Sequence, residues 1–406
     1  MKTASQIRID TFIIRPLALV VNVFVRIAGK LLSIDHRLDR DFKSIAICKF
    51  KGLGSIVQAT PMISAFRKAY PQAEIIFVST SSNQALLQEL KDIDTIYTLD
   101  DSSLIRLISS YVGLQWRLLK KRPEVFIDLE IYSNFSTLVG VFALSKNRIG
   151  FYLRSSSFKM GIYTHMMFYN STLPIAAVYF QVFRLFKPDE KMPGLFRFDE
   201  QVNDEQLDIQ LIGPYIVINP NASDLRIERR WPASFFRAFI EQVQVNHPTI
   251  QLVLIGSKSE SSYVTEIATG FNTQRVINLA GKTSMRGLIN LIKHSNCVVT
   301  NDTGPMHLAF ASKKPTICLF GPCSPEQYGQ VENTKIHYKN MYCSPCVHEF
   351  STPPCKGNNS CMQAITVAEV LQSFHEFMAT GTFSTHEVNP PRFAFGDHIL
   401  GQVNRN

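Results

Sequence analysis

The chain has 406 residues, of which 45% are hydrophobic and 18% charged, and this composition excludes a disordered protein and predicts two or three folded domains. The formal net charge is +9, and residues 1–50 hold +5 of it through nine Lys or Arg and four Asp, a basic and apolar start that points to an anionic surface such as a membrane. We expect no nucleic-acid partner, because the excess charge lies in an apolar segment without the aromatic and basic interleaving of a single-strand groove.

Residues 1–41 are expected to form an amphipathic helix in a membrane interface, with residues 11–34 as the contact. The longest uncharged stretch, Pro16 to Val25, has ten residues, which is too short to cross a bilayer, and no small-residue cleavage site marks a signal peptide. On a helix, a basic stripe opposes a broad apolar face. The stripe holds Thr11, Arg15, Asn22, Arg26, Ser33, Arg37 and Arg40. Packing on the protein's own core, or an oligomer contact, is the alternative.

Between residues 42 and 190, short apolar runs alternate with segments of helical spacing, which predicts a parallel sheet covered on both faces. The expected strands are 44–50, 74–79, 94–99 and 124–130. The expected helices lie after the turn KGLGS and at 83–91, 102–121, 135–145 and 174–187. Residues 150–200 are otherwise less regular, and the proline-containing, charged stretch 187–194 indicates a linker.

The alternation restarts in residues 191–380, and residues 381–406 are expected to form an irregular tail. The expected strands are 215–220, 250–256, 275–281, 297–302 and 315–321. The expected helices follow residue 232 and cover 259–269, 284–293, 305–312 and 366–378. The sequence therefore predicts an α/β protein of two Rossmann-like domains whose parallel sheets face a central cleft. In such sheets, ligands lie at the carboxyl ends of the strands.

One strand end carries an unusual set of polar and turn residues. The run CVVTND delivers Asp302 to the end of a strand, and Thr303-Gly304-Pro305 turns directly into a short helix that holds His307 in its first turn. A helix N-terminus offers free N–H groups and a positive dipole end, so it can bind a phosphate. A second turn, Gly321-Pro322, lies at the next strand end. The alternative is a helix that Asp302 or Thr303 merely caps.

The run D-T-G-P-x-H-x-A-x-A-x-x-x-P-x-x-x-L-F-G-P, from Asp302 to Pro322, resembles the signature of glycosyltransferase family nine, the ADP-heptose:lipopolysaccharide heptosyltransferase family, with Phe310 where the family often has Ala. The stretches KFKGLGSIVQATPMISAFRKAYPQAEIIFV, RIERRWPASFF and LVLIGSKSE also resemble family segments, so the resemblance spans residues 44–375. It implies a GT-B fold with the donor in the C-terminal domain. It also implies inverting transfer of a sugar, heptose in most of the family, from a nucleotide sugar to a lipid-linked saccharide such as lipopolysaccharide core.

The resemblance also implies residue roles in the donor site. Arg229 stands where the family has a phosphate-binding lysine, and Arg226 is its neighbour. Glu260 is a candidate ligand of the ribose, although a helix start is an equal reading. His307 and the helix N–H groups would stabilise the leaving diphosphate. No Asp-x-Asp pair marks a divalent-metal site, so we expect no cofactor for the chemistry. The expected donor-binding residues are Arg229, Arg226, Gly256, Glu260, Asp302, Thr303, Gly304, Pro305 and Gly321.

The glycine turn departs from the family pattern. The family has Gly-Asp there, with the Asp as the expected base, whereas this chain has Gly54-Ser55 after Gly52. A serine cannot act as a base at neutral pH, so another carboxylate replaces it or the protein does not catalyse. Glu130 and Asp128, which share one face of a predicted strand, are the substitutes, and we favour Glu130. The rival functions are a non-catalytic relative that binds a nucleotide sugar or glycan, and a nucleotide-sugar epimerase or hydrolase.

Four cysteines form the pattern C-x2-C-x8-C-x5-C within the loop 343–361. Cys343, Cys346, Cys355 and Cys361 fit a structural zinc site, and His348 is a possible substitute ligand. Two disulfides, free thiols or an iron–sulfur cluster are the alternatives. Eight cysteines in 406 residues are too sparse for a disulfide-stabilised secreted protein. We therefore expect a reducing, cytoplasmic location, peripheral to the inner face of the cytoplasmic membrane.

Overall fold

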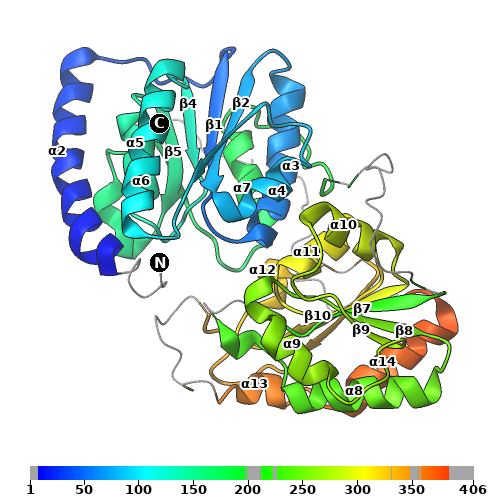
Figure 1. Ribbon diagram of the computed structural model, residues 1–406. Helices are drawn as coiled ribbons and strands as arrows, with labels where there is room; N and C mark the ends of the chain where they lie inside the picture. Colours follow the sequence, from blue (N-terminus) through cyan, green and yellow to red (C-terminus); the bar gives the residue numbers. More distant parts are fainter. Residues whose placement is uncertain are drawn as a thin grey trace.

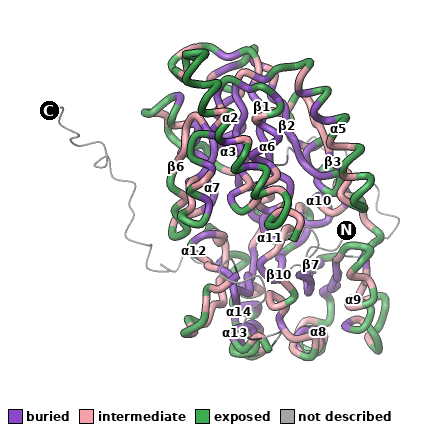
Figure 2. The backbone as a smooth tube through the Cα atoms, turned by 90° about the vertical axis from the view of Figure 1, so that its left-hand side faces the viewer, coloured by how far each residue is buried: buried purple, intermediate pink, exposed green. Residues whose placement is uncertain are grey.

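The computed structural model describes residues 8–196, 198, 211, 213–222, 226–330, 332–347, 355 and 358–383. These residues form two α/β domains, which Figure 1 shows one above the other. Each domain is built on a six-stranded parallel sheet. Figure 2 shows that buried residues run through both sheets and that exposed residues lie on the outer helices. The prediction of two Rossmann-like domains with parallel sheets is confirmed.

The sheet of the N-terminal domain has the strand order β3-β2-β1-β4-β5-β6. Its strands are β1 (Ser44–Cys48), β2 (Glu74–Thr80), β3 (Thr95–Leu99), β4 (Val125–Asp128), β5 (Asn147–Tyr152) and β6 (His165–Phe168). Its α-helices are α2 (Arg15–Leu32), α3 (Leu53–Ala69), α4 (Gln84–Leu87), α5 (Leu104–Lys121), α6 (Phe135–Phe142) and α7 (Ile175–Arg184). Helices α3 and α7 pack together on one face of the sheet, while α5 and α6 cover the other.

The sheet of the C-terminal domain has the order β12-β11-β10-β7-β8-β9. Its strands are β7 (Tyr215–Asn219), β8 (Gln251–Leu254), β9 (Val276–Asn278), β10 (Cys297–Asn301), β11 (Thr316–Phe320) and β12 (Thr334–Tyr338). Its α-helices are α8 (Ala233–Asn246), α9 (Ser261–Ala268), α10 (Met285–His294), α11 (Gly304–Ala311), α12 (Pro325–Tyr328), α13 (Ser360–Gln363) and α14 (Val367–Thr380). Short 3-10 turns lie at Ser81–Asn83, Arg154–Lys159, Ile227–Arg229 and Lys258–Glu260.

Both sheets follow the same order when read from the third strand of each domain, which is the 3-2-1-4-5-6 order of a Rossmann fold. The order reverses between β1 and β4 in one domain and between β7 and β10 in the other. Ligands of such sheets bind outside the carboxyl ends of the strands at this reversal. The residues after Cys48, Asp128, Asn219 and Asn301 are therefore the ones to examine.

The structure adds elements that the sequence did not reveal. Strands β5 and β6 lie in the stretch that we expected to be mostly irregular, and β12 follows the last predicted strand. The helix predicted at 83–91 contracts to a 3-10 turn and the four-residue α4. Most of the predicted tail, from residue 384 onward, lies outside the described residues.

Helix α3 has two local devices that fix its shape. It begins after Gly52, whose φ of 88° is a conformation that favours glycine. Pro61 lies inside the helix and cannot donate to the carbonyl of Val57 four residues earlier. The Thr60 hydroxyl donates to that carbonyl instead, at 2.6 Å. The same hydroxyl accepts a hydrogen bond from the N–H of Phe196 at 3.0 Å.

The two domains meet along helices α3 and α11. Apolar residues of α3, α7, α10 and α11 belong to one continuous buried cluster, so this part of the boundary is packed rather than open. An ion pair between Arg286 of α10 and Glu89, at 3.0 Å, closes the outer side. Gln327 of α12 donates to the hydroxyl of Tyr169 in the N-terminal domain. The relative position of the domains is thus fixed by both apolar and polar contacts.

Helix α2 lies on the outside of the N-terminal domain (Figure 1), and several of its polar side chains contact the protein. The Asn22 amide donates to the carbonyl of Met160 at 3.1 Å, Arg26 also binds that carbonyl, and Arg15 lies over the ring of Phe158. The apolar side points outward: Leu17, Val20, Val23, Phe24, Ile27 and Leu31 are exposed. The helical segment Asp10–Leu32 is, by length and composition alone, long and apolar enough to cross a membrane. A single such helix near the N-terminus is weak support for a span.

Candidate active site

The start of α11 is free of a side-chain cap. Thr303 has extended backbone angles at the N-cap position, but no side-chain oxygen accepts from the first turn of the helix. The Thr303 hydroxyl instead accepts from the Asn219 amide at 2.7 Å, which ties it to the end of β7. The simple capping role that we considered as an alternative is therefore not observed. No side chain caps the backbone N–H groups of this first turn, so they are available to an anionic ligand.

Arg229 lies beside this helix start. Its guanidinium donates to the Asp302 carbonyl at 3.3 Å and lies 3.7 Å from the Asp302 carboxylate. Burial by itself lowers the pKa of Arg229, but Cys323, Asp302 and Tyr328 raise it above the ordinary value. The side chain is 23% exposed, so a permanent positive charge reaches the surface next to the α11 N-terminus. The segments 226–230 and 302–307 thus face each other, as the donor-site hypothesis requires.

Several buried polar atoms around this point have no hydrogen-bond partner among the described residues. They are Asn221 Oδ1, Glu228 Oε2, Arg229 Nε, Arg230 Nε and Asp302 Oδ2. A buried polar group without a partner costs about 1–3 kcal/mol, and such groups are rare in native proteins. These atoms lie on three segments, at residue 221, at 228–230 and at residue 302, and they indicate a place where a polar ligand completes the hydrogen bonding.

Three side chains hold the Arg229 loop in position. The Asn301 carbonyl oxygen accepts from the N–H of Trp231 at 3.1 Å, and its amide donates to Pro220 at 2.9 Å. Trp231 is fully buried and its indole donates to the carbonyl of Ile365. The Asn359 amide donates to the carbonyls of Glu228 and Arg230. The sequence pointed to the loop but not to Asn219 or Asn359, which lie far from the recognisable motif.

His307 faces the N-terminal domain rather than the Arg229 side. The Gln58 amide of α3 donates to Nδ1 at 3.0 Å, and the ring lies against Gly54, where a Cβ would be 2.0 Å from Cδ2. Burial lowers the pKa of His307 to about 4, so the ring is neutral at pH 7. A neutral ring in this position joins the domains and adds no positive charge. A direct role for His307 at the reacting group stays a prediction.

The other expected donor residues occupy varied positions. Glu260 accepts from the N–H and hydroxyl of Ser257 in a capping box, which is the helix-start alternative. Gly256 packs against the Asn221 amide, and Gly321 packs against Met362 and Cys361, where a Cβ would overlap their atoms. Gly304 and Pro305 open α11, with Gly304 close to Leu53 of the other domain. The Arg226 side chain donates to the carbonyl of Val347.

Glu130 lies at the reversal point of the N-terminal sheet, across from this group. Its Oε1 accepts from the N–H of Phe50 at 2.7 Å and of Lys51 at 2.8 Å, and pairs with Lys49 at 3.1 Å. Burial alone would lower the pKa of Lys49, but Glu130 more than offsets this and the pKa is raised. Oε2 takes none of these three contacts. One carboxylate oxygen is thus anchored, and the other is the candidate proton acceptor.

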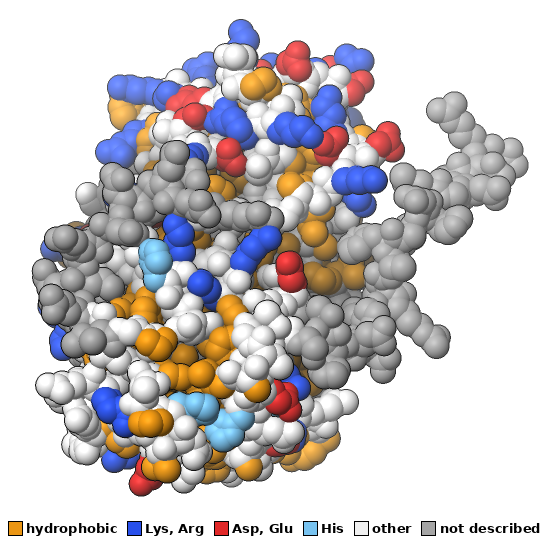
Figure 3. All heavy atoms as spheres, turned by 90° about the vertical axis from the view of Figure 1, so that its right-hand side faces the viewer, with side chains coloured by type: hydrophobic (Ala, Val, Ile, Leu, Met, Phe, Trp, Pro, Cys, Tyr) orange, Lys and Arg blue, Asp and Glu red, His pale blue; other side chains and the backbone are white. Residues whose placement is uncertain are grey.

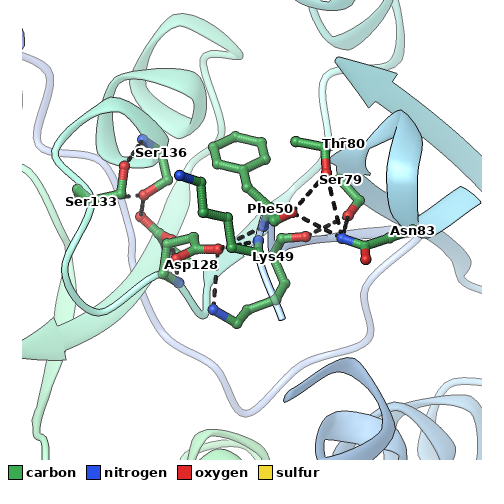
Figure 4. Close-up of polar contacts among 10 residues, drawn as sticks. Lys49, Phe50, Ser79, Thr80, Asn83, Asp128, Ser133 and Ser136 are labelled. Atoms are coloured by element: carbon green, nitrogen blue, oxygen red, sulfur yellow. Dashed lines mark hydrogen bonds and ion pairs between the residues drawn. The ribbon is translucent and has the colours of Figure 1, made fainter. Parts of the chain in front are cut away.

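The backbone that anchors Glu130 is itself held from β2. Figure 4 shows Ser79, Thr80 and Asn83 directed at the backbone of Lys49 and Phe50, which directly follow the end of β1. Ser79 donates to the Lys49 carbonyl at 2.6 Å, and Thr80 and Asn83 donate to the Phe50 carbonyl at 2.8 and 2.9 Å. This set fixes the direction of the N–H groups that bind Glu130. It positions the carboxylate without touching it.

Asp128 points elsewhere, because β4 ends at this residue and the strand alternation does not extend to Glu130. The carboxylate is buried and accepts from the hydroxyls of Ser136 at 2.8 Å and Tyr163 at 2.6 Å; Figure 4 includes the Ser136 contact. Burial raises its pKa to about 6, although Lys159 and the two hydroxyls oppose this. The expected shared face of the two carboxylates is not found, and Asp128 is satisfied within the domain.

Ser55 lies in the first turn of α3 and bonds to the hydroxyl of Tyr179. Burial raises the pKa of Tyr179, so this phenol stays protonated at neutral pH. Next to this region, a cavity of about 140 Å³ is lined by Tyr132, Asn134 and Lys159, and by Arg15 from α2. The glycine turn, Glu130 and the start of α2 therefore border the same side of the N-terminal domain.

The four clustered cysteines are neighbours, but their thiols are not arranged as a metal site. Among the described residues, no group of three or more His, Cys, Asp or Glu side chains is placed to hold an ion. Burial raises the pKa of Cys361 to about 11, and Cys346, Cys343 and Cys355 contribute to the rise. None of the four is in a disulfide. His348 lies outside the described residues, and the zinc site stays a prediction.

The sequence profile of glycosyltransferase family 9 (heptosyltransferase) matches residues 117–356, which is more than half of the chain. The chain belongs to glycosyltransferase family 9. It is therefore a glycosyltransferase of the heptosyltransferase type, and the resemblance seen in the sequence is confirmed.

Relatives within family 9 agree over most of the chain. Lipooligosaccharide heptosyltransferase 2 of Campylobacter jejuni is 25% identical over 327 residues, covering 79% of this chain and 93% of that protein. Lipopolysaccharide heptosyltransferase 3 of Escherichia coli is 26% identical over 280 residues, covering 66% and 80%.

Two solved family 9 structures share the fold. ADP-heptose lps heptosyltransferase II of E. coli has a TM-score of 0.66 at 21% identity, covering 83% of this chain and 98% of that one. The family 9 glycosyl transferase of Veillonella parvula has a TM-score of 0.68 at 19% identity, covering 85% and 99%. This likeness confirms the two-domain GT-B fold.

Proposed function

We propose that this family 9 enzyme transfers a heptose from ADP-heptose to a lipid-linked saccharide such as lipopolysaccharide core, at the inner face of the cytoplasmic membrane. One observation carries the donor half of the proposal. The uncapped start of α11 and the partly exposed guanidinium of Arg229 lie next to each other. A diphosphate supplies the negative charge and the acceptor oxygens that the helix N–H groups and the guanidinium bind.

The names of relatives support the choice of sugar and nucleotide. The solved E. coli relative is an ADP-heptose heptosyltransferase, and another E. coli heptosyltransferase was solved with ADP-2-deoxy-2-fluoro heptose. The relatives named above act on lipooligosaccharide or lipopolysaccharide. We extend these activities to this chain because it spans at least four fifths of their length.

The reaction is a single displacement with inversion at the anomeric carbon. Glu130, through Oε2, takes the proton of the acceptor hydroxyl, and that oxygen forms the new glycosidic bond. The bond between the anomeric carbon and the diphosphate breaks, and its electron pair leaves with the diphosphate. Arg229 and the N–H groups of the α11 turn stabilise the charge that develops there. The contact between Gly54 and His307 holds the two domains at a fixed distance from each other.

The outward apolar side of α2 supports attachment to a membrane surface. Its exposed residues need an apolar partner, and its inward polar stripe is already bound to the protein. The cavity lined by Arg15 of α2 opens next to the Glu130 side of the domain. A saccharide whose lipid lies along α2 would therefore approach the proposed base.

A non-catalytic binding relative and an epimerase or hydrolase were the rival functions. Membership of family 9 does not favour either one. The replacement of the family's Asp by Ser55 motivated the first rival, and the anchored carboxylate of Glu130 at the same sheet edge supports catalysis instead.

The test is a binding and transfer assay with paired arginine variants. ADP and ADP-heptose should raise the unfolding temperature, whereas UDP should do so less. Arg229→Gln should weaken ADP binding roughly 10- to 100-fold, because one charged hydrogen-bond pair is worth about 1.5–3 kcal/mol. Arg237→Gln is the matched control, since that side chain binds the carbonyls of Ile267 and Thr269 and lies over Phe271. If no nucleotide shifts the midpoint, or if both variants bind ADP like the wild type, the proposal fails.

A further inference from the structure

Helix α5 exposes an apolar stripe that no described residue covers. Ile105 is 81% exposed, Val112 63% and Trp116 62%, and Leu104 and Ile108 are also exposed. The helix has a second, buried side that packs Leu114 and Leu118 on the sheet. The exposed apolar residues of α5 are therefore additional to those that pack in the core of the domain. Exposed patches of this kind mark interaction surfaces.

Part of the stripe lies toward α6 rather than toward the sheet edge. Tyr111 of α5 contacts Phe135 of α6, with ring centroids 5.1 Å apart, whereas Arg117 lies over Tyr97 of the edge strand β3. At about 100° per residue, Ile108 and Val112 fall nearer to Tyr111 than to Arg117 around the helix. Ile105 lies midway between these two residues and Trp116 lies nearer to Arg117, so the stripe covers the outer side of α5 with Ile108 and Val112 toward α6.

Helix α6 bridges the stripe to α2. It contacts both α5 and α2. At its end, Phe142 and Leu144 are exposed. Exposed apolar residues therefore occur on all three neighbouring helices, from the outer side of α2 to the stripe of α5.

The charges of the two helices are of one sign. Helix α5 contains four cations and no acid, and α2 contains three cations and no acid. Lys120 lies 5.0 Å from the Trp116 ring, next to the apolar stripe. On the opposite side of the molecule, Figure 3 shows Lys and Arg intermixed with Asp and Glu over the N-terminal domain. Arg106 and Lys121 are paired with Asp100 and Glu74, so Arg117 and Lys120 are the cations of α5 for which the structure shows ring contacts rather than ion pairs.

We infer that α5 is a second membrane-contact helix, and that α2 and α5 together seat the N-terminal domain on a bilayer with anionic headgroups. Apolar side chains enter the acyl boundary, Lys120 and its neighbours meet the headgroups, and Trp116 lies at the interface, where indole rings prefer to be. This inference rests on the proposed function, whose lipid-linked acceptor brings the enzyme to that surface. Contact through both helices fixes the orientation of the domain on the bilayer, whereas contact through α2 alone would only attach it.

Trp116 makes the inference testable in the intact protein. The chain has two tryptophans, and the other, Trp231, is fully buried. Vesicles of phosphatidylcholine with phosphatidylglycerol should shift the emission of Trp116 to the blue, and brominated acyl chains should quench it. The Trp116→Phe variant should lose both signals. Ile105→Ser with Val112→Ser should lower vesicle partitioning at least about tenfold, whereas Val245→Ser, an exposed valine of the other domain, should not.

Each other outcome overturns the inference. If the protein binds vesicles but Trp116 emission is unchanged, α2 alone makes the contact and α5 does not. If vesicles are not bound and Ile105→Ser instead converts a dimer to a monomer, the stripe is an interface between copies. Transfer to a delipidated acceptor is measured in parallel. Loss of vesicle contact with retained transfer separates failure of this inference from failure of the proposed function.

Discussion

The ring of His307 in the C-terminal domain lies directly against Gly54 of the N-terminal domain. A Cβ on Gly54 would lie 2.0 Å from Cδ2 of the ring, and Gln58, one turn further along α3, donates to Nδ1. The glycine turn of one domain and the donor loop of the other therefore meet through their first helical turns. Any change at this contact alters the distance between the proposed base and the bound donor.

Gly54→Ala should separate the domains. The added methyl group overlaps the ring, and both neighbours are buried, so α3 and α11 must move apart. We expect transfer to fall by about 100-fold or more, because a misplacement of about 1 Å can cost that much, while ADP binding to the C-terminal domain persists. Small-angle scattering and steady-state kinetics measure the two effects. Gly113→Ala, on α5 with open space around it, is the control, and equal activity of both variants would contradict the role of this contact.

Glu130→Gln should remove the proposed base. The amide keeps the size of the side chain but cannot take a proton, so kcat should fall about 10²- to 10⁴-fold with little change in donor KM. Glu124→Gln, at an exposed carboxylate that accepts from the Lys43 N–H, should behave like the wild type. Ser55→Ala should retain most activity. The assignment is wrong if Glu130→Gln transfers normally or if Ser55→Ala is the inactive variant.

Asp128→Asn should change the pH dependence of stability. Burial raises the pKa of Asp128 to about 6 in the folded protein, against an ordinary value of 3.8. Between these values the folded state holds a proton that the unfolded state has lost, so this group's contribution to stability falls as pH rises from about 4 to about 6. The stability of the Asp128→Asn variant should not show this decrease as the pH rises. Urea midpoints of both proteins from pH 4 to 7 measure it, and parallel profiles would contradict the raised pKa.

The zinc prediction rests on the cysteine spacing, because no three of the described thiols are placed to hold an ion, and protein purified without chelator tests it. Four thiols that influence one another supply the donor set of a structural site. We expect about one zinc per chain by elemental analysis, its loss in Cys343→Ser and Cys355→Ser, and a lower unfolding temperature after chelation. Cys297→Ala, at a buried strand position, should keep the metal. Metal-free protein with four titratable thiols would refute the prediction.

Local patterns predicted most of the fold. The strands that end at Cys48, Asp128, Asn219 and Asn301 were predicted, with ends one or two residues too late, and the turn before Pro305 was found, because apolar runs, glycines and prolines act over a few residues. Strands β5 and β6 were missed because they are short and contain polar residues such as Asn147 and His165, so the alternation is weak there.

Directions of side chains were beyond the sequence. Which side of α11 carries His307 to the other domain depends on α3, a contact between residues 249 positions apart. Glu130 was selected for its place near a strand end, but its anchoring by Lys49 and two N–H groups is a tertiary arrangement. Helical spacing separated the polar from the apolar residues of α2. The inward direction of the polar side depends on its contacts with the loop at Phe158 and Met160, which the sequence does not reveal.

The Thr60 hydroxyl that relieves the proline in α3 also accepts from Phe196, where the chain leaves the first domain. This hydrogen bond ties the last described part of the N-terminal domain to α3, the helix that packs against α11 of the C-terminal domain. A rotation of the C-terminal domain must preserve this hydrogen bond or break it. Domain opening for product release would then be a rotation through a small angle about α3. A Thr60 substitution would be expected to ease this rotation before it destabilised either domain.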